Sequence, residues 1–321
     1  MSKIFSISIV IPAFNNQATL GMCLDGLLAQ ATGDVEIIVV DDGSTDTTRA
    51  IAESKGVRVL SQSNQGAAAA RNAGARQATG EILMFIDGDC VPERNWIQAM
   101  LAPFANSEIV GACGMKQTQQ SSFIPRFIQL EFDYRYENER KLPYIDFVDS
   151  GTAAYRREVF LQNGGFDTLL SDAEDTDLSY RLSARGYKMA FAGAAIVYDP
   201  HPESLFAYLK RKFEYAFWRT QVYARYPQKV ASDSRTPQTQ KLQGLLVGLG
   251  VCAALASIVW QPALIALGVI AALFLLTTLP FIVRNFRRAP LLALAAPPVI
   301  LLAAFAGTLG IALGILKAKI R

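Results

Sequence analysis

The sequence predicts an α/β domain with a mixed, mostly parallel sheet and flanking helices, followed by a C-terminal transmembrane helical region. Two observations carry this prediction. Short β-branched runs alternate with helical stretches in the N-terminal part, and charge disappears from long stretches of the C-terminal part. Apolar strands separated by helices are typical of parallel sheets buried on both faces, and uncharged runs of about 20 residues can span a bilayer.

Four apolar runs are typical of buried strands, and the stretches between them are typical of helices. The strands are expected at 6–11, 36–40, 57–60 and 82–86, and the helices at 19–30, 46–55 and 66–78. Ligands of such sheets bind beyond the carboxyl ends of the strands. Polar residues fall there: Asn15 after the first strand, Asp41 and Asp42 after the second, Asp87 and Asp89 after the fourth.

The C-terminal region has the length and composition of membrane-spanning helices. We predict a first domain at 1–230, a linker at 231–241, and a membrane region at 242–321 with hydrophobic segments at 242–260, 262–283 and 289–316. A buried hairpin of a soluble protein is the alternative, but these runs exceed what a core helix needs.

The basic loop at 284–288 favours a cytoplasmic location by the positive-inside rule. We therefore predict a multi-pass protein of the cell membrane with a cytoplasmic N-terminal domain. A full third crossing would place Lys317, Lys319 and Arg321 on the other side, against the rule. Pro297 and Pro298 could instead break the last segment into a re-entrant hairpin, and both topologies stay open.

Charge is divided unevenly along the chain. From Lys241 onward there are seven Lys and Arg and no Asp or Glu, which leaves 24 basic and 28 acidic residues before it. An acidic N-terminal domain argues against a nucleic-acid partner. The sequence has neither G-x-G-x-x-G nor G-x-x-x-x-G-K-[ST], so the usual dinucleotide and P-loop phosphate sites are missing. Four scattered cysteines form no metal or disulfide pattern.

The tripeptide Asp87-Gly88-Asp89 follows the apolar strand at 82–86. Two carboxylates at a strand end can converge on one hard divalent cation, Mn²⁺ or Mg²⁺. An acidic turn is the simpler alternative. A phosphatase with Asp87 as nucleophile is another, although its motif would follow the first strand rather than the fourth.

Carboxylates also close the second strand, where Asp41 and Asp42 begin the segment VDDGSTD. They can accept hydrogen bonds from a nucleobase or from ribose hydroxyls, or the loop can simply lead into a helix N-cap. Arg71, in an Ala-rich helical stretch that starts after Gly66, could pair with a nucleotide. Its alternative is an ordinary solvated charge.

Acidic residues crowd the start of the helix that runs to Arg185. Ser171 and Glu174 have capping-box spacing, and Asp177 and Arg181 form an i,i+4 pair. The crowding of Glu174 and Asp175 goes further, because like charges raise the pKa of one member and suit it to act as a general base. His201 is the only histidine. A lone histidine is more often incidental than a ligand, but its imidazole suits manganese and would complement Asp89.

Taken together, these segments resemble the family 2 glycosyltransferases, which have the Rossmann-like GT-A fold. The resemblance covers roughly residues 6–215 and rests on an ordered series of motifs. In order they are SIVIPAFNN, VDDGSTD, NQGAAAARNAG, GEILMFIDGDC, GTAAYRREVF, NGGFD, EDTDLSYRLSARGYK and the late His201.

The resemblance implies a nucleotide-sugar donor, an inverting transfer and the roles of the site residues. Asp175 would be the base, with Glu174 beside it, and Asp87, Asp89 and His201 would hold the cation. The donor, with a uracil base favoured, would contact the following residues: Pro12, Ala13, Asn15, Asp41, Asp42, Gly66, Arg71 and Asp87. Ser150 and Gly151 would face the sugar or the acceptor.

The segment 203–226 interleaves aromatic and basic residues, which is typical of an interfacial helix, or of a helix packed on the sheet. With the membrane region, it favours a lipid-linked or glycan acceptor. Gly244-x-x-x-Gly248 and Gly310-x-x-x-Gly314 could pack helices between chains, which would allow a homo-oligomer. A membrane-anchored, non-catalytic nucleotide-sugar binding protein remains the alternative from a different functional class.

Overall fold

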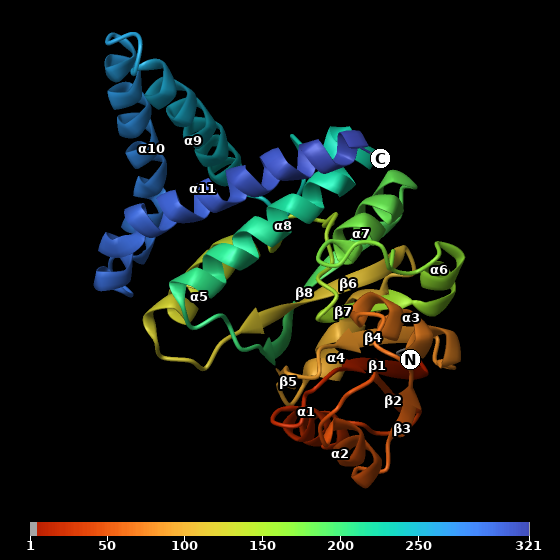
Figure 1. Ribbon diagram of the computed structural model, residues 1–321. Helices are drawn as coiled ribbons and strands as arrows, with labels where there is room; N and C mark the ends of the chain where they lie inside the picture. Colours follow the sequence, from red (N-terminus) through yellow and green to blue (C-terminus); the bar gives the residue numbers. More distant parts are fainter. Residues whose placement is uncertain (1–4, 321) are drawn as a thin grey trace. The chain divides into compact units, whose positions relative to one another are not determined.

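The chain divides into two compact units. Unit 1 holds the residues up to Gln119 together with Tyr136–Pro200, and unit 2 holds Gln120–Arg135 together with the chain from His201 onward. The structure is a computed structural model that describes residues 5–320, and side chains of residues 5–317 (Figure 1). Lys319 and Arg321 of the orientation argument, and the outer ends of the predicted domains at 1 and 321, therefore lie outside what is described in full.

Within the described residues, unit 1 is built on one mixed sheet of eight strands (Figure 1). The strands are β1 (Ile7–Ala13), β2 (Val35–Asp41), β3 (Arg58–Ser61), β4 (Ile82–Ile86), β5 (Val91–Pro92), β6 (Ile109–Gln117), β7 (Thr152–Arg156) and β8 (Lys188–Tyr198). Their order is β3-β2-β1-β4-β7-β6-β8-β5. The first four in this order are parallel, β7 runs antiparallel to both its neighbours, and β8 is parallel to β6.

Helices cover both faces of this sheet because its central strands are apolar on both sides. In β1, Ile9 and Ile11 join the core with α1 (Leu20–Leu28), α2 (Thr48–Ser54) and α4 (Trp96–Leu101), which continues as η1 (Ala102–Ala105). Val10 points to the other core, with α3 (Ala67–Gln77), α6 (Arg157–Gln162) and α7 (Glu174–Ala184). The α/β class and the mostly parallel sheet predicted from the sequence are confirmed.

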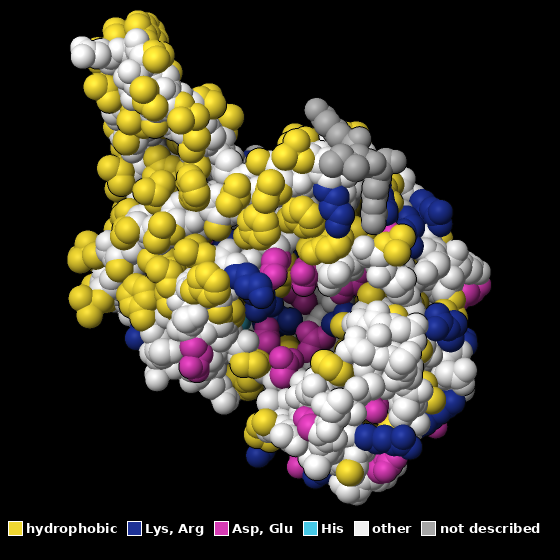
Figure 2. Space-filling model, in the orientation of Figure 1, with side chains coloured by type: hydrophobic (Ala, Val, Ile, Leu, Met, Phe, Trp, Pro, Cys, Tyr) yellow, Lys and Arg dark blue, Asp and Glu magenta, His cyan; other side chains and the backbone are white. Residues whose placement is uncertain are grey.

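Unit 2 is helical. Its elements are α5 (Phe123–Glu139, as far as Arg135), α8 (Leu205–Arg225), η2 (Pro227–Lys229), α9 (Gln238–Ala256), α10 (Ala263–Asn285) and α11 (Pro290–Ile320). Among the described residues, three helices are long and apolar enough to cross a membrane: Gln238–Ala256, Ala263–Asn285 and Pro290–Lys317. Figure 2 shows hydrophobic side chains over the surface of α9 and α10. The C-terminal apolar helices expected from the sequence are present.

The last helix, α11, is continuous through Pro297 and Pro298. The break that a re-entrant hairpin would need at these prolines is absent, so that alternative was wrong. The division into two units also differs from the predicted domains. Residues 120–135 and 201–230 belong to the same unit as the apolar helices, whereas the composition of the sequence places the boundary near 230. Helix α9 begins at Gln238, inside the predicted linker.

The glycines of both G-x-x-x-G motifs pack against other helices of the same chain. A Cβ at Gly310 would lie 2.4 Å from the carbonyl oxygen of Phe213 on α8, and one at Gly314 would lie 2.8 Å from that of Phe217. Thr308 Oγ1 donates to the carbonyl oxygen of Gly244, 3.2 Å away. Small residues let helix backbones approach closely, and here they bring α8 and α9 against α11.

An apolar cluster joins the early segment of unit 2 to these helices. Phe127 of α5 and Tyr208 of α8 are almost fully buried, with ring centroids 6.1 Å apart. Phe127 also meets Phe281 of α10 at 5.3 Å. The remaining buried members of this cluster come from α5, α9, α10, α11 and the residue before α11: Ile124, Ile128, Leu246, Val247, Phe274, Ala289, Leu292, Ala296, Val299, Ile300 and Ala303.

Candidate active site

Polar side chains gather in unit 1 where the parallel strands end. Ala13 at the end of β1 lies opposite Asp41 at the end of β2, and β4 runs parallel to β1 on its other side. The loops that follow these strands therefore share one edge of the sheet. The structure brings Asn15, Asp41 and Asp42 together there, as their order in the sequence suggested.

The carboxylate of Asp42 organises the loop before α3. Its Oδ2 accepts a hydrogen bond from the backbone N–H of Gly66 (2.8 Å), and its Oδ1 accepts from that of Gln65 (2.9 Å) and from Gln62 Nε2 (2.7 Å). Asp41 Oδ1 accepts from the backbone N–H of Ser44 at 3.0 Å. The predicted donor-site residues of the second strand thus lie beside Gly66 and hold its loop.

Asn15 ties the loop after β1 to the loop after β2. Its Oδ1 accepts from the backbone N–H of Thr45 at 2.9 Å, and its own N–H donates to Ser44 Oγ at 3.0 Å. The backbone of Asn15 has a φ of 53°, which is uncommon for a residue other than glycine. Pro12 and Ala13, also expected near the nucleobase, are buried at the end of β1.

The predicted metal-binding motif, Asp87-Gly88-Asp89, follows the end of β4. Ligand atoms of Asp87, Asp89 and Cys90 all lie within 4.8 Å of one another. Burial, together with the charges of Asp87 and Asp199, raises the pKa of Asp89 to about 6. Burial also raises the pKa of the Cys90 thiol well above its usual range, so the carboxylates are the available anionic ligands.

Arg71 connects this motif to the acidic pair formed by Glu174 and Asp175. The side chain is buried, contrary to the solvated charge considered as its alternative. Nη2 donates to Asp87 Oδ1 at 2.5 Å, and Nη1 donates to Glu174 Oε1 at 3.0 Å. One guanidinium thus joins the end of β4 to the first residue of α7, which the sequence did not indicate.

The acidic pair begins α7, but the expected capping box was wrong. The N-cap is Ala173 rather than Ser171, and the Glu174 carboxylate accepts from Arg71 and from Ser150 Oγ (3.1 Å). Burial, followed by the charge of Asp175, raises the pKa of Glu174, while Arg71 opposes the shift. Asp175 Oδ1 accepts from the backbone N–H of Thr176 at 2.6 Å.

The expected i,i+4 ion pair at this helix does form, between Asp177 and Arg181. Asp177 lies in the same first turn as the acidic pair, and its carboxylate is buried. The acidic residues of α7 are therefore divided between a structural pair within the helix and the group that faces Arg71.

The loop before β7 lies tightly against the metal-binding motif. A Cβ at Gly151 would overlap Asp87 Oδ2 and Lys116 Nζ, so a larger residue here would displace one or both side chains. The close approach places Ser150 within hydrogen-bond distance of Glu174. The predicted sugar or acceptor residues are therefore next to both carboxylate groups.

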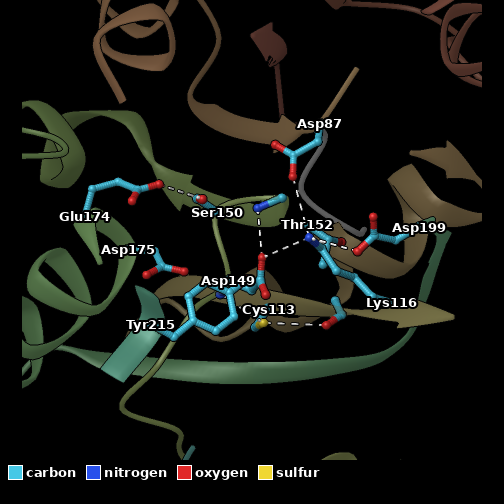
Figure 3. A network of polar contacts seen from close by, with 12 residues as sticks. Asp87, Cys113, Lys116, Asp149, Ser150, Thr152, Glu174, Asp175, Asp199 and Tyr215 are labelled. Atoms are coloured by element: carbon cyan, nitrogen blue, oxygen red, sulfur yellow. Dashed lines mark hydrogen bonds and ion pairs between the residues drawn. The ribbon is translucent and has the colours of Figure 1, made fainter. Parts of the chain in front are cut away.

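Lys116 and Asp199, which the sequence did not single out, complete this group (Figure 3). Lys116 of β6 is buried and points toward Asp87, Asp149 and Asp199. The only signals in the sequence are a lysine that follows an apolar run and an aspartate shortly before His201. Neither signal says which distant carboxylates would meet.

His201 belongs to unit 2, where it is buried. Its backbone N–H donates to Gln120 Oε1 at 2.7 Å, and Nε2 lies 3.3 Å from Gln129 Oε1. The ring packs against Phe132, with centroids 5.0 Å apart. Its role as a cation ligand beside Asp89 would join the two units and stays a prediction.

Comparison with known proteins identifies the domain. Residues 8–164 match the family described as Glycosyl transferase family 2. The chain carries a family 2 glycosyltransferase domain. Several named glycosyltransferases are similar to this chain. The pre-mycofactocin glycosyltransferase of Mycobacterium tuberculosis is 27% identical over 235 residues, which are 70% of this chain and 49% of that protein. The uncharacterized glycosyltransferase EpsJ of Bacillus subtilis is 30% identical over 217 residues, 62% of each chain.

Solved structures bear on the fold of the glycosyltransferase domain. The mannosyltransferase PcManGT from Pyrobaculum calidifontis, solved with GDP-Man and Mn²⁺, has a TM-score of 0.61 at 19% identity and covers 96% of this chain and 88% of that one. GalNAc-T7, solved with UDP, GalNAc and Mn²⁺, has a TM-score of 0.52 at 18% identity, over 73% and 52% of the chains. The fold is GT-A. The chain spans about half the length of the first of its named relatives.

Proposed function

We propose that the chain is a membrane-anchored, metal-dependent glycosyltransferase that moves a sugar from a nucleotide diphosphate sugar to an acceptor hydroxyl, with inversion at the anomeric carbon. The donor we favour is a UDP-sugar. The acceptor we favour is a lipid-linked or polysaccharide glycan at the cytoplasmic face of the cell membrane. The three apolar helices, long enough to cross a bilayer, support the membrane anchor.

The observation that carries this proposal is the link that Arg71 makes between Asp87 and Glu174. Transfer needs charge neutralisation at the leaving diphosphate and a base at the acceptor hydroxyl, held in one reaction centre. The link holds the metal-binding motif and the acidic pair together within unit 1. The fold neighbours, solved with a nucleotide or nucleotide sugar and Mn²⁺, support the same ligands here.

The donor set fits a hard divalent cation, because Asp87 and Asp89 offer carboxylate oxygens close to each other. We assign both residues and His201 as its ligands, with Mn²⁺ or Mg²⁺ as the ion; the imidazole favours Mn²⁺. When bound, the cation supplies positive charge that stabilises the departing diphosphate.

The base that we propose is Asp175. Glu174 Oε1 is already engaged by Arg71 and Ser150, which suits Glu174 to position the start of α7 rather than to accept a proton. A carboxylate placed at the acceptor hydroxyl contributes typically about 10²–10⁴-fold to the rate. Ser150 and Gly151, beside both groups, would face the sugar or the acceptor.

The nucleotide would lie at the strand ends of the sheet. The residues that we assign to it are Pro12, Ala13, Asn15, Asp41, Asp42, Gly66, Arg71 and Asp87. The hydrogen bonds of Asp42 to the backbone at Gln65 and Gly66 support this assignment, since they hold two loops of that edge in fixed positions.

The proposal is tested with detergent-solubilised protein, a panel of UDP-, GDP- and dTDP-sugars, Mn²⁺ or Mg²⁺, and a membrane lipid extract as acceptor source. Released nucleotide and lipid-linked product are measured for the wild type, Asp89→Asn and Asp175→Asn. Asp34→Asn, at an exposed aspartate outside the site, is the matched control.

We expect release from one donor, stimulated by the lipid extract, lost in both site variants and kept in the control. No transfer with any donor would favour the non-catalytic binding protein. Transfer that Asp175→Asn leaves intact would remove Asp175 as the base. The anomeric configuration of the product, read by NMR, decides between inversion and retention.

A further inference from the structure

A buried ammonium group lies among the carboxylates of the metal-binding motif. Lys116 Nζ is 3.3 Å from Asp199 Oδ2, 3.4 Å from Asp149 Oδ1 and 3.5 Å from Asp87 Oδ2. The lysine side chain is 6% exposed, and the side chain of Asp199 is 7% exposed. These four residues come from separate elements: β6, the end of β4, the loop before β7 and the residue after β8.

Because of this arrangement, the site already holds a positive charge. Three carboxylate oxygens lie within 3.5 Å of Nζ, so the side chain keeps the positive charge that a lysine ordinarily carries. Lys116 is therefore an ammonium ion. It faces the same Asp87 that is expected to hold a divalent cation.

The backbone packs closely around this ammonium. A methyl group at Gly151 would overlap the carboxylate of Asp87 and the ammonium of Lys116 where they now lie. On the strand itself, the backbone N–H of Lys116 donates to the hydroxyl of Tyr136 at 2.9 Å, and the Tyr136 ring stacks on Phe191. The lysine is thus held in place from its backbone to its ammonium.

We propose that Lys116 is a resident cation that opposes binding of a divalent cation alone and favours binding of the cation together with a nucleotide diphosphate. This inference rests on the proposed function, because it concerns the donor and metal of that site. The ammonium already neutralises carboxylate charge and repels a second cation. A diphosphate brings negative charge that both cations attract, so metal and nucleotide bind cooperatively.

The alternative is that Lys116 only stabilises the structure of the site. In that case removal of Lys116 leaves the carboxylates of Asp87, Asp149 and Asp199 to repel one another, the site loosens, and divalent cations bind more weakly. The two roles therefore predict opposite signs for the change in metal affinity, which separates them without any activity measurement.

The experiment measures Mn²⁺ binding to the full-length protein in detergent, by the loss of the electron paramagnetic resonance signal of free Mn²⁺. Wild type, Lys116→Met and Lys116→Arg are titrated with Mn²⁺ alone. Wild type is also titrated with Mn²⁺ in the presence of UDP, GDP or dTDP, with the binding of Mn²⁺ by the free nucleotide measured separately. Thermal unfolding checks that each variant is folded, and Lys116→Gln replaces Lys116→Met if the latter is not.

We expect Lys116→Met to bind Mn²⁺ alone at least about tenfold more tightly than the wild type, and Lys116→Arg to bind like the wild type. We expect one nucleotide to raise the Mn²⁺ affinity of the wild type by about tenfold or more, and by linkage Mn²⁺ to raise that of the nucleotide equally. Weaker or unchanged Mn²⁺ binding by the folded methionine or glutamine variant overturns the inference. So does wild-type protein that binds Mn²⁺ equally well with and without every nucleotide, a test that needs no variant.

These outcomes stay separate from the proposed function. If Mn²⁺ and nucleotide bind as expected but no sugar is transferred, the transferase activity fails and the inference stands. If transfer occurs but loss of the ammonium weakens Mn²⁺ binding, the proposed function stands and the inference fails.

Discussion

Arg71 and Glu174 form an ion pair of 3.0 Å although 103 positions separate them in the chain. Both side chains are more than nine-tenths buried, and the second arm of the same guanidinium reaches Asp87. A planar fork with two donating arms suits two carboxylates better than an ammonium does. The pair therefore fixes the distance between the metal-binding motif and α7.

Replacement of Arg71 by methionine is expected to lower the free energy of unfolding by about 3–5 kcal/mol, because it leaves the buried carboxylate of Glu174 without its cation and takes one of two cations from Asp87. Arg71→Lys keeps the charge but not the fork, and we expect at least tenfold less nucleotide release from it. Thermal unfolding in detergent and the release assay measure the two effects. Arg76→Met, at an exposed position of the same helix, should change neither; a wild-type rate in Arg71→Lys would contradict the bridging role.

A methyl group at Gly151 should disturb the metal-binding motif. Since that Cβ would overlap Asp87 and Lys116, Gly151→Ala is expected to weaken Mn²⁺ binding in the presence of nucleotide by at least tenfold. The electron paramagnetic resonance titration measures this. Gly21→Ala, where the nearest atom is an ordinary contact at 3.9 Å, is the control. Equal affinities in both variants would show that the loop can yield.

Metal affinity should depend on pH through Asp89. A divalent cation binds the ionised carboxylate, and the pKa of Asp89 is about 6. Above pH 7 the affinity should be constant. Below pH 6 it should fall, by about tenfold from pH 7 to pH 5, because protons then compete for the carboxylate. Mn²⁺ titration across this range measures the effect, and a flat profile between pH 5 and 7 would refute the assignment.

The contact between α8 and α11 should not tolerate a large side chain. Gly310→Leu would force a side chain onto the carbonyl oxygen of Phe213, and we expect it to cost about 1–3 kcal/mol of stability or more. The midpoint of thermal unfolding in detergent should fall. Gly268→Leu is the matched control, because a Cβ there meets nothing within 4 Å. Equal midpoints for the two variants would argue against close packing at this contact.

The sequence predicted what depends on local pattern. The strands β1, β2 and β4 are short apolar runs bounded by polar loops, so periodicity located them within two residues. The metal-binding motif and the acidic pair were visible because their carboxylates are adjacent in the chain. Resemblance to a known family then ordered them into one site.

What the sequence could not predict depends on long-range pairing. The antiparallel β7 lies between β4 and β6, so the carboxylates of Asp87 and Asp149 meet Lys116 only once the sheet is assembled. A lysine in sequence is usually solvated, and the apolar run before Lys116 does not show that the lysine itself is buried. The capping box failed for the same reason: Glu174 is drawn to Arg71, a partner from a distant helix.

The apolar cluster of unit 2 limits how the chain can be shortened. Phe127 and Tyr208 precede the three long apolar helices in sequence, yet they are buried with residues of α9, α10 and α11. A chain cut after residue 230 would keep these two rings and lose the residues that cover them. Such a truncation would expose a hydrophobic surface to water and aggregate, so soluble expression of the N-terminal part requires polar replacements on α5 and α8 as well as removal of the membrane helices.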